Sequence, residues 1–169
     1  MNRIIFPLLV AILLVTGCQT NTNYQESDTP LFFGSFAGLS PASPEIIKVI
    51  SWNVRFSEAV ETSISELATV PELQDADILL LQEMDELGVE AVARALSLNY
   101  VYYPASIHSH HERNFGNAIL SKWPISNPAK IILPFENPKN GQIRTATRAL
   151  VAIGGKNILT YSCLLYTSD

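Results

Sequence analysis

The chain has 169 residues, of which 47% are hydrophobic, so it is long enough to bury the core of one domain. It carries 11 Lys and Arg against 16 Asp and Glu, a formal net charge of −5, and its basic residues do not cluster. This balance argues against a protein that is held on nucleic acid by a basic face, but it does not exclude a nuclease, because a bound metal ion supplies its own positive charge.

Residues 1–17 are typical of a signal peptide for export. Arg3 supplies a positive start, and the apolar stretch that follows over 4–15 is too short to span a bilayer comfortably. It ends in Leu14-Val-Thr-Gly-Cys18, which resembles the lipobox of bacterial lipoproteins, with Cys18 as the lipidated residue. An ordinary cleaved signal with an incidental cysteine is the alternative. We expect an exported lipoprotein that is anchored in a bacterial membrane and faces the periplasm or the cell surface.

Residues 18–44 are interpreted as a flexible tether between membrane and domain, because Thr, Asn, Ser, Pro and Gly dominate there. The apolar run Leu31-Phe-Phe-Gly-Ser-Phe36 interrupts this composition. We expect it to pack on the domain surface, with membrane contact as the alternative. The one other cysteine of the chain is Cys163, so no disulfide framework is indicated.

The folded domain is predicted over 45–162 and begins with alternating strands and helices. A β-branched apolar run at 46–54 predicts a strand buried on both faces, and helical spacing at 57–68 predicts a helix that Pro71 ends or kinks. A second buried strand is predicted at 78–82. The next helix carries on one face Val89, Val92, Ala93 and Leu96. This order predicts parallel strands joined by helical crossovers.

After Asn99 the pattern changes to short strands separated by Pro, Gly and Asn turns. No long helical period intervenes, so antiparallel neighbours are expected. The predicted strands are 100–103, 117–121, 129–133, 146–153 and 157–161. The fold class is therefore α/β with a mixed sheet and no internal repeat.

Two polar side chains stand at the ends of the predicted parallel strands. Asn53 lies in Ile50-Ser-Trp-Asn-Val-Arg-Phe56, and Glu83 lies in Asp77-Ile-Leu-Leu-Leu-Gln-Glu-Met-Asp85. Proteins of the α/β class place ligands at this edge of the sheet, and Mg²⁺ often takes one or two carboxylates. Glu83 is therefore a candidate metal ligand, and Asn53 would orient a water or donate to phosphate. A solvated acid and a turn-forming Asn are the alternatives.

Three segments in order resemble the endonuclease/exonuclease/phosphatase superfamily, which includes deoxyribonuclease I, apurinic endonucleases, inositol polyphosphate phosphatases and bacterial sphingomyelinases. They are the two strand-end motifs and Phe115-Gly-Asn-Ala-Ile-Leu-Ser-Lys-Trp-Pro-Ile125, with support from Arg144-Thr-Ala-Thr-Arg-Ala149. The resemblance implies a four-layer αββα sandwich of the deoxyribonuclease I-like type. It also implies hydrolysis of a phosphoester with Mg²⁺ as cofactor, and Mn²⁺ is the other candidate cation.

The resemblance assigns Glu83 and Asn53 to the metal and catalytic site. Asn117 lies in the Gly-Asn-Ala motif and is a weaker catalytic candidate, since it could equally shape the backbone at a strand start. Arg144 could contact the substrate phosphate, although an Arg that opens an exposed strand needs no such role.

The end of the chain departs from the pattern of the superfamily. Members usually carry Thr-His-Leu at the end of a strand like 157–161, then an Asp-x-Asn pair and a terminal Asp-His pair. Here Tyr161-Ser162 is followed by 163–169, a tail that resembles translated adaptor sequence. We therefore expect an N-terminal fragment of a longer protein, with a sandwich that is incomplete at the C-terminus and inactive as it stands.

His108, His110 and His111 form a histidine cluster. Imidazoles this close could bind a transition metal, and His108 and His110 could share one strand face. No carboxylate or cysteine has a metal-ligand spacing to them, so a polar loop is favoured. The loop could also flank the substrate cleft, with Arg113 or a His touching phosphate.

The leading prediction is an exported, membrane-tethered, Mg²⁺-dependent phosphoesterase that cleaves a phosphodiester or a phosphomonoester. Its partners would be the substrate, which is nucleic acid, a nucleotide, a sugar phosphate or a phospholipid head group, and the membrane through the N-terminal lipid. No protein partner is indicated. The alternative is a non-catalytic surface lipoprotein that uses the same fold for binding.

Overall fold

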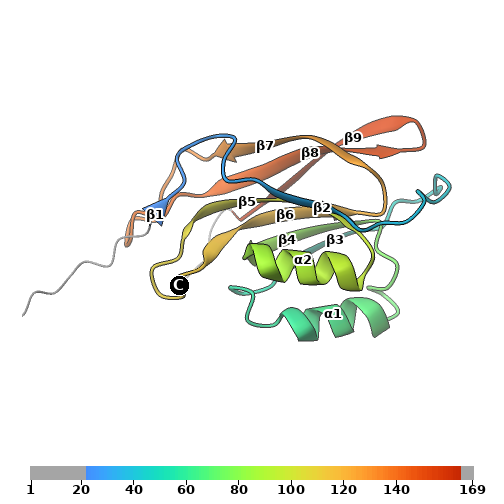
Figure 1. Ribbon diagram of the computed structural model, residues 1–169, viewed down its shortest axis with the longest axis horizontal. Helices are drawn as coiled ribbons and strands as arrows, with labels where there is room; N and C mark the ends of the chain where they lie inside the picture. The colour runs from blue at the N-terminus through green and yellow to red at the C-terminus, as the bar shows by residue number, and fades with distance from the viewer. Residues whose placement is uncertain (1–21, 165–169) are drawn as a thin grey trace, which may run out of the picture.

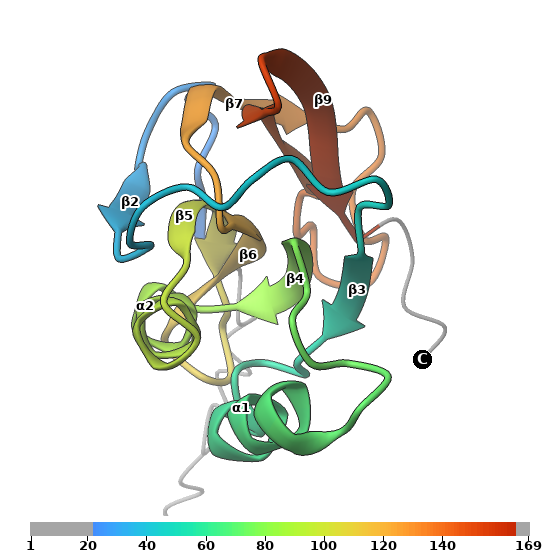
Figure 2. The same ribbon diagram turned by 90° about the vertical axis from the view of Figure 1, so that its right-hand side faces the viewer.

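Two helices, a six-stranded sheet and a three-stranded sheet form three layers in the computed structural model, which describes residues 22–164 (Figure 1). The helices α1 (Val60–Thr69) and α2 (Glu86–Ala95) cover one face of the larger sheet, and the smaller sheet covers the other face (Figure 2). The α/β class and the two-sheet sandwich are thus confirmed. Neither helix of the described part has the length and apolar character to cross a membrane. The predicted signal peptide, Cys18 and residues 165–169 lie outside the described residues.

The larger sheet runs in the order β1-β5-β6-β4-β3, and β2 also pairs with β5. Its strands are β1 (Thr22–Asn23), β2 (Phe32–Ser35), β3 (Val49–Asn53), β4 (Ile78–Met84), β5 (Asn99–Ile107) and β6 (Asn114–Ser121). The strands β3 and β4 are parallel and are joined through α1, whereas β4, β6 and β5 are antiparallel neighbours. The predicted order of alternating strands and helices, followed by antiparallel strands, is confirmed.

The smaller sheet is an antiparallel meander of β7 (Ile125–Ile132), β8 (Thr145–Ile153) and β9 (Lys156–Cys163). These strands match the last three predicted from the sequence, with longer ends. The predicted domain end at 162 falls inside β9, because Cys163 still pairs with Ala146. A hairpin at Gly154 and Gly155, both with positive φ, joins β8 to β9.

The position of β4 between two hydrophobic cores explains why the first half of this strand is apolar. Leu79 and Leu81 are fully buried on the helical side, together with Val89 and Val92 of α2, whereas Ile78 faces the smaller sheet. Burying each such side chain contributes about 1.5–3 kcal/mol of transfer free energy. The strand therefore holds both cores together and gives its carboxyl end a rigid support.

The prediction that β3 is buried on both faces is wrong. Val49, Ser51 and Asn53 are exposed on one face, while Ile50 and Trp52 pack partly against the helical core. Within residues 22–164, β3 pairs with β4 alone and stands at the sheet edge. A β-branched composition reports a residue's fit to a pleated surface, which an edge strand satisfies as well as a central one.

The interpretation of 18–44 as a flexible tether is wrong for residues 22–36, which pair with β5 or pack on the domain. The strands β1 and β2 both pair antiparallel with the edge of β5. Buried Lys130 donates hydrogen bonds to the carbonyls of Tyr24 and Thr29, so the segment between the two strands is also held. The apolar run 31–36 packs on the domain, as expected. Composition missed the strands because it cannot show that β5 offers an edge.

Candidate active site

Asn53 and Glu83 lie side by side at the carboxyl ends of the two parallel strands. The register places Asn53 opposite Gln82, one residue before Glu83. Asn53 Nδ2 donates a hydrogen bond to Glu83 Oε1 at 2.9 Å. Asn53 is exposed, whereas Glu83 is only 4% exposed. The predicted meeting of these two side chains is confirmed.

Glu83 is the extra residue of a β-bulge in β4. Gln82 pairs with Asn117 and Met84 pairs with Gly116, so no residue of β6 stands opposite Glu83. Its φ is 58°, in the left-handed region, which costs a residue with a Cβ about 1–2 kcal/mol. The bulge interrupts the alternation of the strand and allows the carboxylate to reach Asn53 at the sheet edge.

The chain after β3 makes a left-handed turn where the sequence predicted the start of a helix. Arg55, Phe56 and Ser57 have φ values of 46°, 55° and 55°. Asn53 Oδ1 accepts a hydrogen bond from the Arg55 N–H at 2.9 Å, and the Ser57 N–H donates to the Glu83 carbonyl at 3.0 Å. These bonds fasten the turn to the bulge, so α1 begins only at residue 60. With the bond from Nδ2 to Glu83, the bond from the Arg55 N–H to Oδ1 engages both polar atoms of the Asn53 amide, which favours an orienting role over direct metal ligation.

Asp85 joins the bulge to α2 and to the histidine loop 108–113. Its Oδ1 accepts from the Gly88 N–H at 2.7 Å, which caps the helix, and its Oδ2 accepts from Arg113 Nη1 at 2.9 Å. Arg113 Nη2 donates to the Phe56 carbonyl at 3.0 Å. Ser57 Oγ accepts from the Asp85 N–H at 2.8 Å. Arg113, which the sequence suggested for phosphate contact, thus ties the loop to the site.

Asn117 connects the two sheets. Its side-chain Nδ2 donates to the Thr145 carbonyl at 2.8 Å, and its own carbonyl accepts from Thr147 Oγ1 at 2.8 Å. The residue is 4% exposed. The geometry therefore favours the structural alternative for this candidate. The preceding residue, Gly116, is a glycine for a steric reason, because a Cβ at this position would collide with the Tyr103 carbonyl oxygen.

Four rings pack together beside the turn: Phe56, His108, His111 and Phe115. Phe56 stacks with His111 and meets His108 edge-on, each at 4.7 Å between ring centroids, and lies 5.3 Å from Phe115. Burial, followed by the neighbouring His111, His110 and Arg144, lowers the pKa of His108. Across residues 22–164, no group of three or more His, Cys, Asp or Glu side chains is placed to hold a metal ion. The favoured interpretation of 108–113 as a loop is confirmed.

Arg144 lies behind this ring cluster at the start of β8. Its guanidinium carbon is 5.7 Å from the centroid of the Phe115 ring, and Nη1 donates to Gln142 Oε1 at 3.0 Å. Gln142 in turn donates to Ser106 Oγ at 2.9 Å. Arg144 is 8% exposed, so it is not the exposed strand opener of the sequence-based alternative. It is a fixed cation close to the rings that adjoin the Asn53–Glu83 pair.

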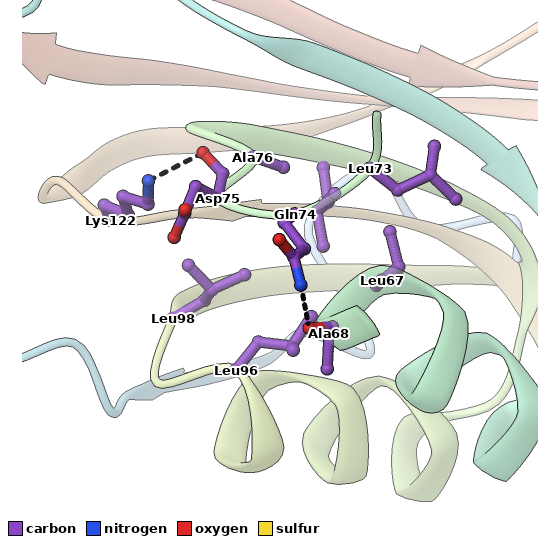
Figure 3. A pocket seen from close by; sticks show the side chains of 10 residues that line it. Leu67, Ala68, Leu73, Gln74, Asp75, Ala76, Leu96, Leu98 and Lys122 are labelled. Carbon is purple, nitrogen blue, oxygen red and sulfur yellow. Dashed lines mark hydrogen bonds between the residues drawn. The ribbon is translucent and has the colours of Figure 1, made fainter. Parts of the chain in front are cut away.

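A cavity of about 290 Å³ lies at the opposite end of β4 from Glu83, between the ends of α1 and α2 (Figure 3). Leucines form half of its lining: Leu67, Leu73, Leu79, Leu96 and Leu98. At its rim, Lys122 Nζ donates to the Asp75 carbonyl at 2.7 Å and to Asp77 Oδ1 at 3.2 Å. The cavity is thus remote from the site, and Gln74 and Lys122 of its lining each donate to a backbone carbonyl, of Ala68 and Asp75 respectively.

Residues 50–162 match the sequence model of the Endonuclease/Exonuclease/phosphatase family. This chain belongs to that family. The matched stretch contains Asn53, Glu83, Asn117 and Arg144. A comparison with curated proteins found no match. The endonucleases, exonucleases and phosphatases that give this family its name cleave phosphoester bonds, and the family generally depends on a divalent metal.

Solved structures share the fold at low sequence identity. A family protein from Leptotrichia buccalis C-1013-b aligns with a TM-score of 0.54 at 16% identity, over 72% of this chain and 55% of its own. Humanized D. rerio TDP2 aligns with a TM-score of 0.55 at 20% identity, over 72% of this chain and 48% of its own. Sphingomyelinase C from Streptomyces griseocarneus aligns with a TM-score of 0.54 at 17% identity, over 73% of this chain and 50% of its own. The chain thus spans about half the length of these structures.

Proposed function

We propose that this chain contributes a metal site to a Mg²⁺-dependent phosphoesterase, with Glu83 as the metal ligand and Asn53 as the residue that orients it. The observation that carries the proposal is the 2.9 Å hydrogen bond between them, at the carboxyl ends of two parallel strands in the family-matched stretch. Ligands of α/β proteins bind at this edge of the sheet.

The surroundings of Glu83 suit a cation. A buried carboxylate is costly unless it is paired, and no ion pair formed by the described residues involves Glu83. A carboxylate offers about four lone-pair sites, so the hydrogen bond from Asn53 leaves capacity for an ion. Mg²⁺ keeps several waters and needs only one or two carboxylates, which is compatible with a single Glu; Mn²⁺ has the same preference for oxygen.

The protein side chains then have separate tasks. A bound divalent ion would polarise the phosphoryl oxygens and lower the pKa of a bound water. Asn53 holds the Glu83 carboxylate in one orientation through Nδ2, and the Arg55 N–H fixes the amide. Arg144 is the candidate contact for the substrate phosphate, since its buried guanidinium is already held by Gln142.

The proposal includes export and lipid attachment at Cys18, on the strength of the N-terminal sequence pattern. The substrate classes compatible with the site are nucleic acids, nucleotides, sugar phosphates and phospholipid head groups. They share the phosphoester that the metal site and Arg144 would engage.

The test is hydrolysis of bis(p-nitrophenyl) phosphate by the full-length protein, with Mg²⁺ and with EDTA. Glu83→Gln should lower the Mg²⁺-dependent rate by about 100-fold or more, and Asn53→Ala by about 10–100-fold, as for the loss of a residue that orients a ligand. Glu90→Gln is the matched control, because Glu90 lies exposed on α2 in a pair with Arg94. An unchanged rate in Glu83→Gln would show that the metal assignment is wrong. Metal binding without hydrolysis would favour the non-catalytic binding module.

A further inference from the structure

We propose that the candidate active site faces the membrane in which the chain is anchored, and that its substrate is a phosphoester displayed at that membrane surface. The inference rests on the proposed function and on the proposed lipid at Cys18. We call the carboxyl ends of β3 and β4, together with β1 and the loop 108–113, the site end of the domain. Three observations place the anchor there.

The first observation is the position of β1, where the described chain begins. Thr22 pairs with Ile107 of β5, the residue directly before the histidine loop. Figure 1 shows β1 at the same end of the molecule as the connection between β5 and β6. Asn23 fixes the strand from its other side, since Nδ2 donates to the Gly141 carbonyl at 2.8 Å and Oδ1 accepts from the Ile143 N–H at 3.2 Å.

The second observation is a hydrogen-bonded connection from this segment to the site. Tyr24 Oη donates to Asn114 Oδ1 at 2.8 Å, and Asn114 Nδ2 donates to Glu86 Oε2 at 2.8 Å. Glu86 is the first residue of α2 and follows Glu83 by three positions. Two hydrogen bonds, through Asn114, therefore connect Tyr24 of the N-terminal segment to Glu86, which follows the bulge.

The third observation is the length of chain between lipid and domain. Three residues, 19–21, separate Cys18 from Thr22, and the four residue steps from one to the other span at most about 14 Å when the chain is fully extended. A free linker over 18–44 would instead have a root-mean-square length of about 28 Å and would impose no orientation. Because β1 is paired, the lipid holds the site end within about 14 Å of the bilayer surface.

This orientation decides among the substrate classes. A short anchor gives the site a high effective concentration of whatever the bilayer displays, and phospholipid head groups carry phosphodiesters there. The competing orientation would use the far end of the domain, where Leu39 and Ile46 are exposed. The hairpin between β8 and β9 also lies at that far end (Figure 1) and offers a reporter position.

The orientation is tested by fluorescence quenching in vesicles. The full-length protein is expressed with its own N-terminal segment in a bacterium, in a Cys163→Ser background, and placed in phosphatidylcholine vesicles that contain head-group spin label. A fluorophore is attached through His110→Cys in the loop 108–113 or Lys156→Cys in the far hairpin, both exposed positions. We expect stronger quenching at position 110 than at 156. Equal quenching, or stronger quenching at 156, would overturn the proposal.

Two further variants separate the anchor from the orientation. Cys18→Ser should release the protein from the membrane and abolish quenching at both positions; persistent quenching would refute the lipid anchor. A Gly/Ser spacer of about 20 residues inserted after Thr20 should abolish the difference between the two labels, because a flexible linker imposes no orientation. A difference that survives the spacer would mean that the anchor length does not set the orientation.

The spacer also tests the substrate class. It should lower Mg²⁺-dependent hydrolysis of phosphatidylcholine in the same vesicles by roughly tenfold, since effective concentration falls with about the 3/2 power of linker length. Hydrolysis of soluble bis(p-nitrophenyl) phosphate should not change. An equal effect on both substrates would overturn the membrane substrate. Failure to hydrolyse either substrate would refute the proposed function itself, and the quenching pattern would still decide the orientation.

Discussion

Glu83 receives a hydrogen bond from Asn53 at 2.9 Å while its own backbone is held at a φ of 58°. The side chain and the backbone of this residue therefore do different things. The carboxylate forms the candidate cation site, and the left-handed backbone completes the bulge that presents it. Substitutions at this position can change one property without the other.

Replacing Glu83 by Gln should remove metal affinity with little effect on folding. The Gln side-chain carbonyl can still accept the Asn53 hydrogen bond, but the charge that holds a divalent ion is gone. We expect Mn²⁺ affinity, measured by titration calorimetry, to fall by about 100-fold or more. Glu83→Gly should also lose the metal, while its stability to urea stays within about 1–2 kcal/mol, because glycine relieves the left-handed strain. Retained Mn²⁺ affinity in Glu83→Gln would remove Glu83 as the ligand.

Arg113→Ala should loosen the histidine loop and destabilise the fold. The substitution deprives the buried Asp85 carboxylate of its partner at 2.9 Å and the Phe56 carbonyl of a donor. Because Arg113 is itself 45% exposed at its side chain, we expect a loss of about 1–2 kcal/mol in urea unfolding. Arg55→Ala, which breaks an exposed pair with Glu58 at 3.9 Å, should cost less than about 1 kcal/mol. Equal losses for the two variants would contradict the anchoring role.

His108 should make stability fall as the pH drops below its unfolded pKa of 6.5. Burial, with His111, His110 and Arg144 nearby, lowers the folded pKa, so the unfolded chain binds more protons between the two pKa values. Unfolding free energy therefore rises with pH up to about 6.5. His108→Gln should flatten this rise in urea titrations between pH 5 and 7.

Gly116→Ala should be among the most damaging single-methyl additions in this domain. A Cβ at Gly116 would meet backbone atoms of Tyr103 and Pro104, which cannot move without disrupting the pairing of β5 with β6. We expect a loss of about 1–3 kcal/mol or more. Gly38→Ala is the control, since nothing lies within 4 Å of a Cβ there, and it should change stability little. Urea midpoints of the two variants provide the comparison.

The sequence by itself was sufficient to identify the helices, the strands from β3 onward and the central pair of the candidate site. Continuous apolar runs and helical spacing are local patterns, so the alternating β3-α1-β4-α2 order followed from them. Asn53 and Glu83 were identifiable because each follows an apolar strand, and parallel strands bring their carboxyl ends to one edge. The family motifs added the expectation of a metal-dependent phosphoesterase.

Tertiary structure decided what depends on partners distant in the chain. The bulge at Glu83 exists because the consecutive β6 residues Gly116 and Asn117 pair with Met84 and Gln82 and leave Glu83 without an opposite residue. Arg113 likewise reaches Asp85 across 28 positions. The strands β1 and β2 formed from a polar, proline-containing segment because β5 left an edge to pair with. Local propensity reports only a residue's neighbours in sequence, whereas backbone pairing, burial and strain depend on which surfaces the rest of the fold brings near.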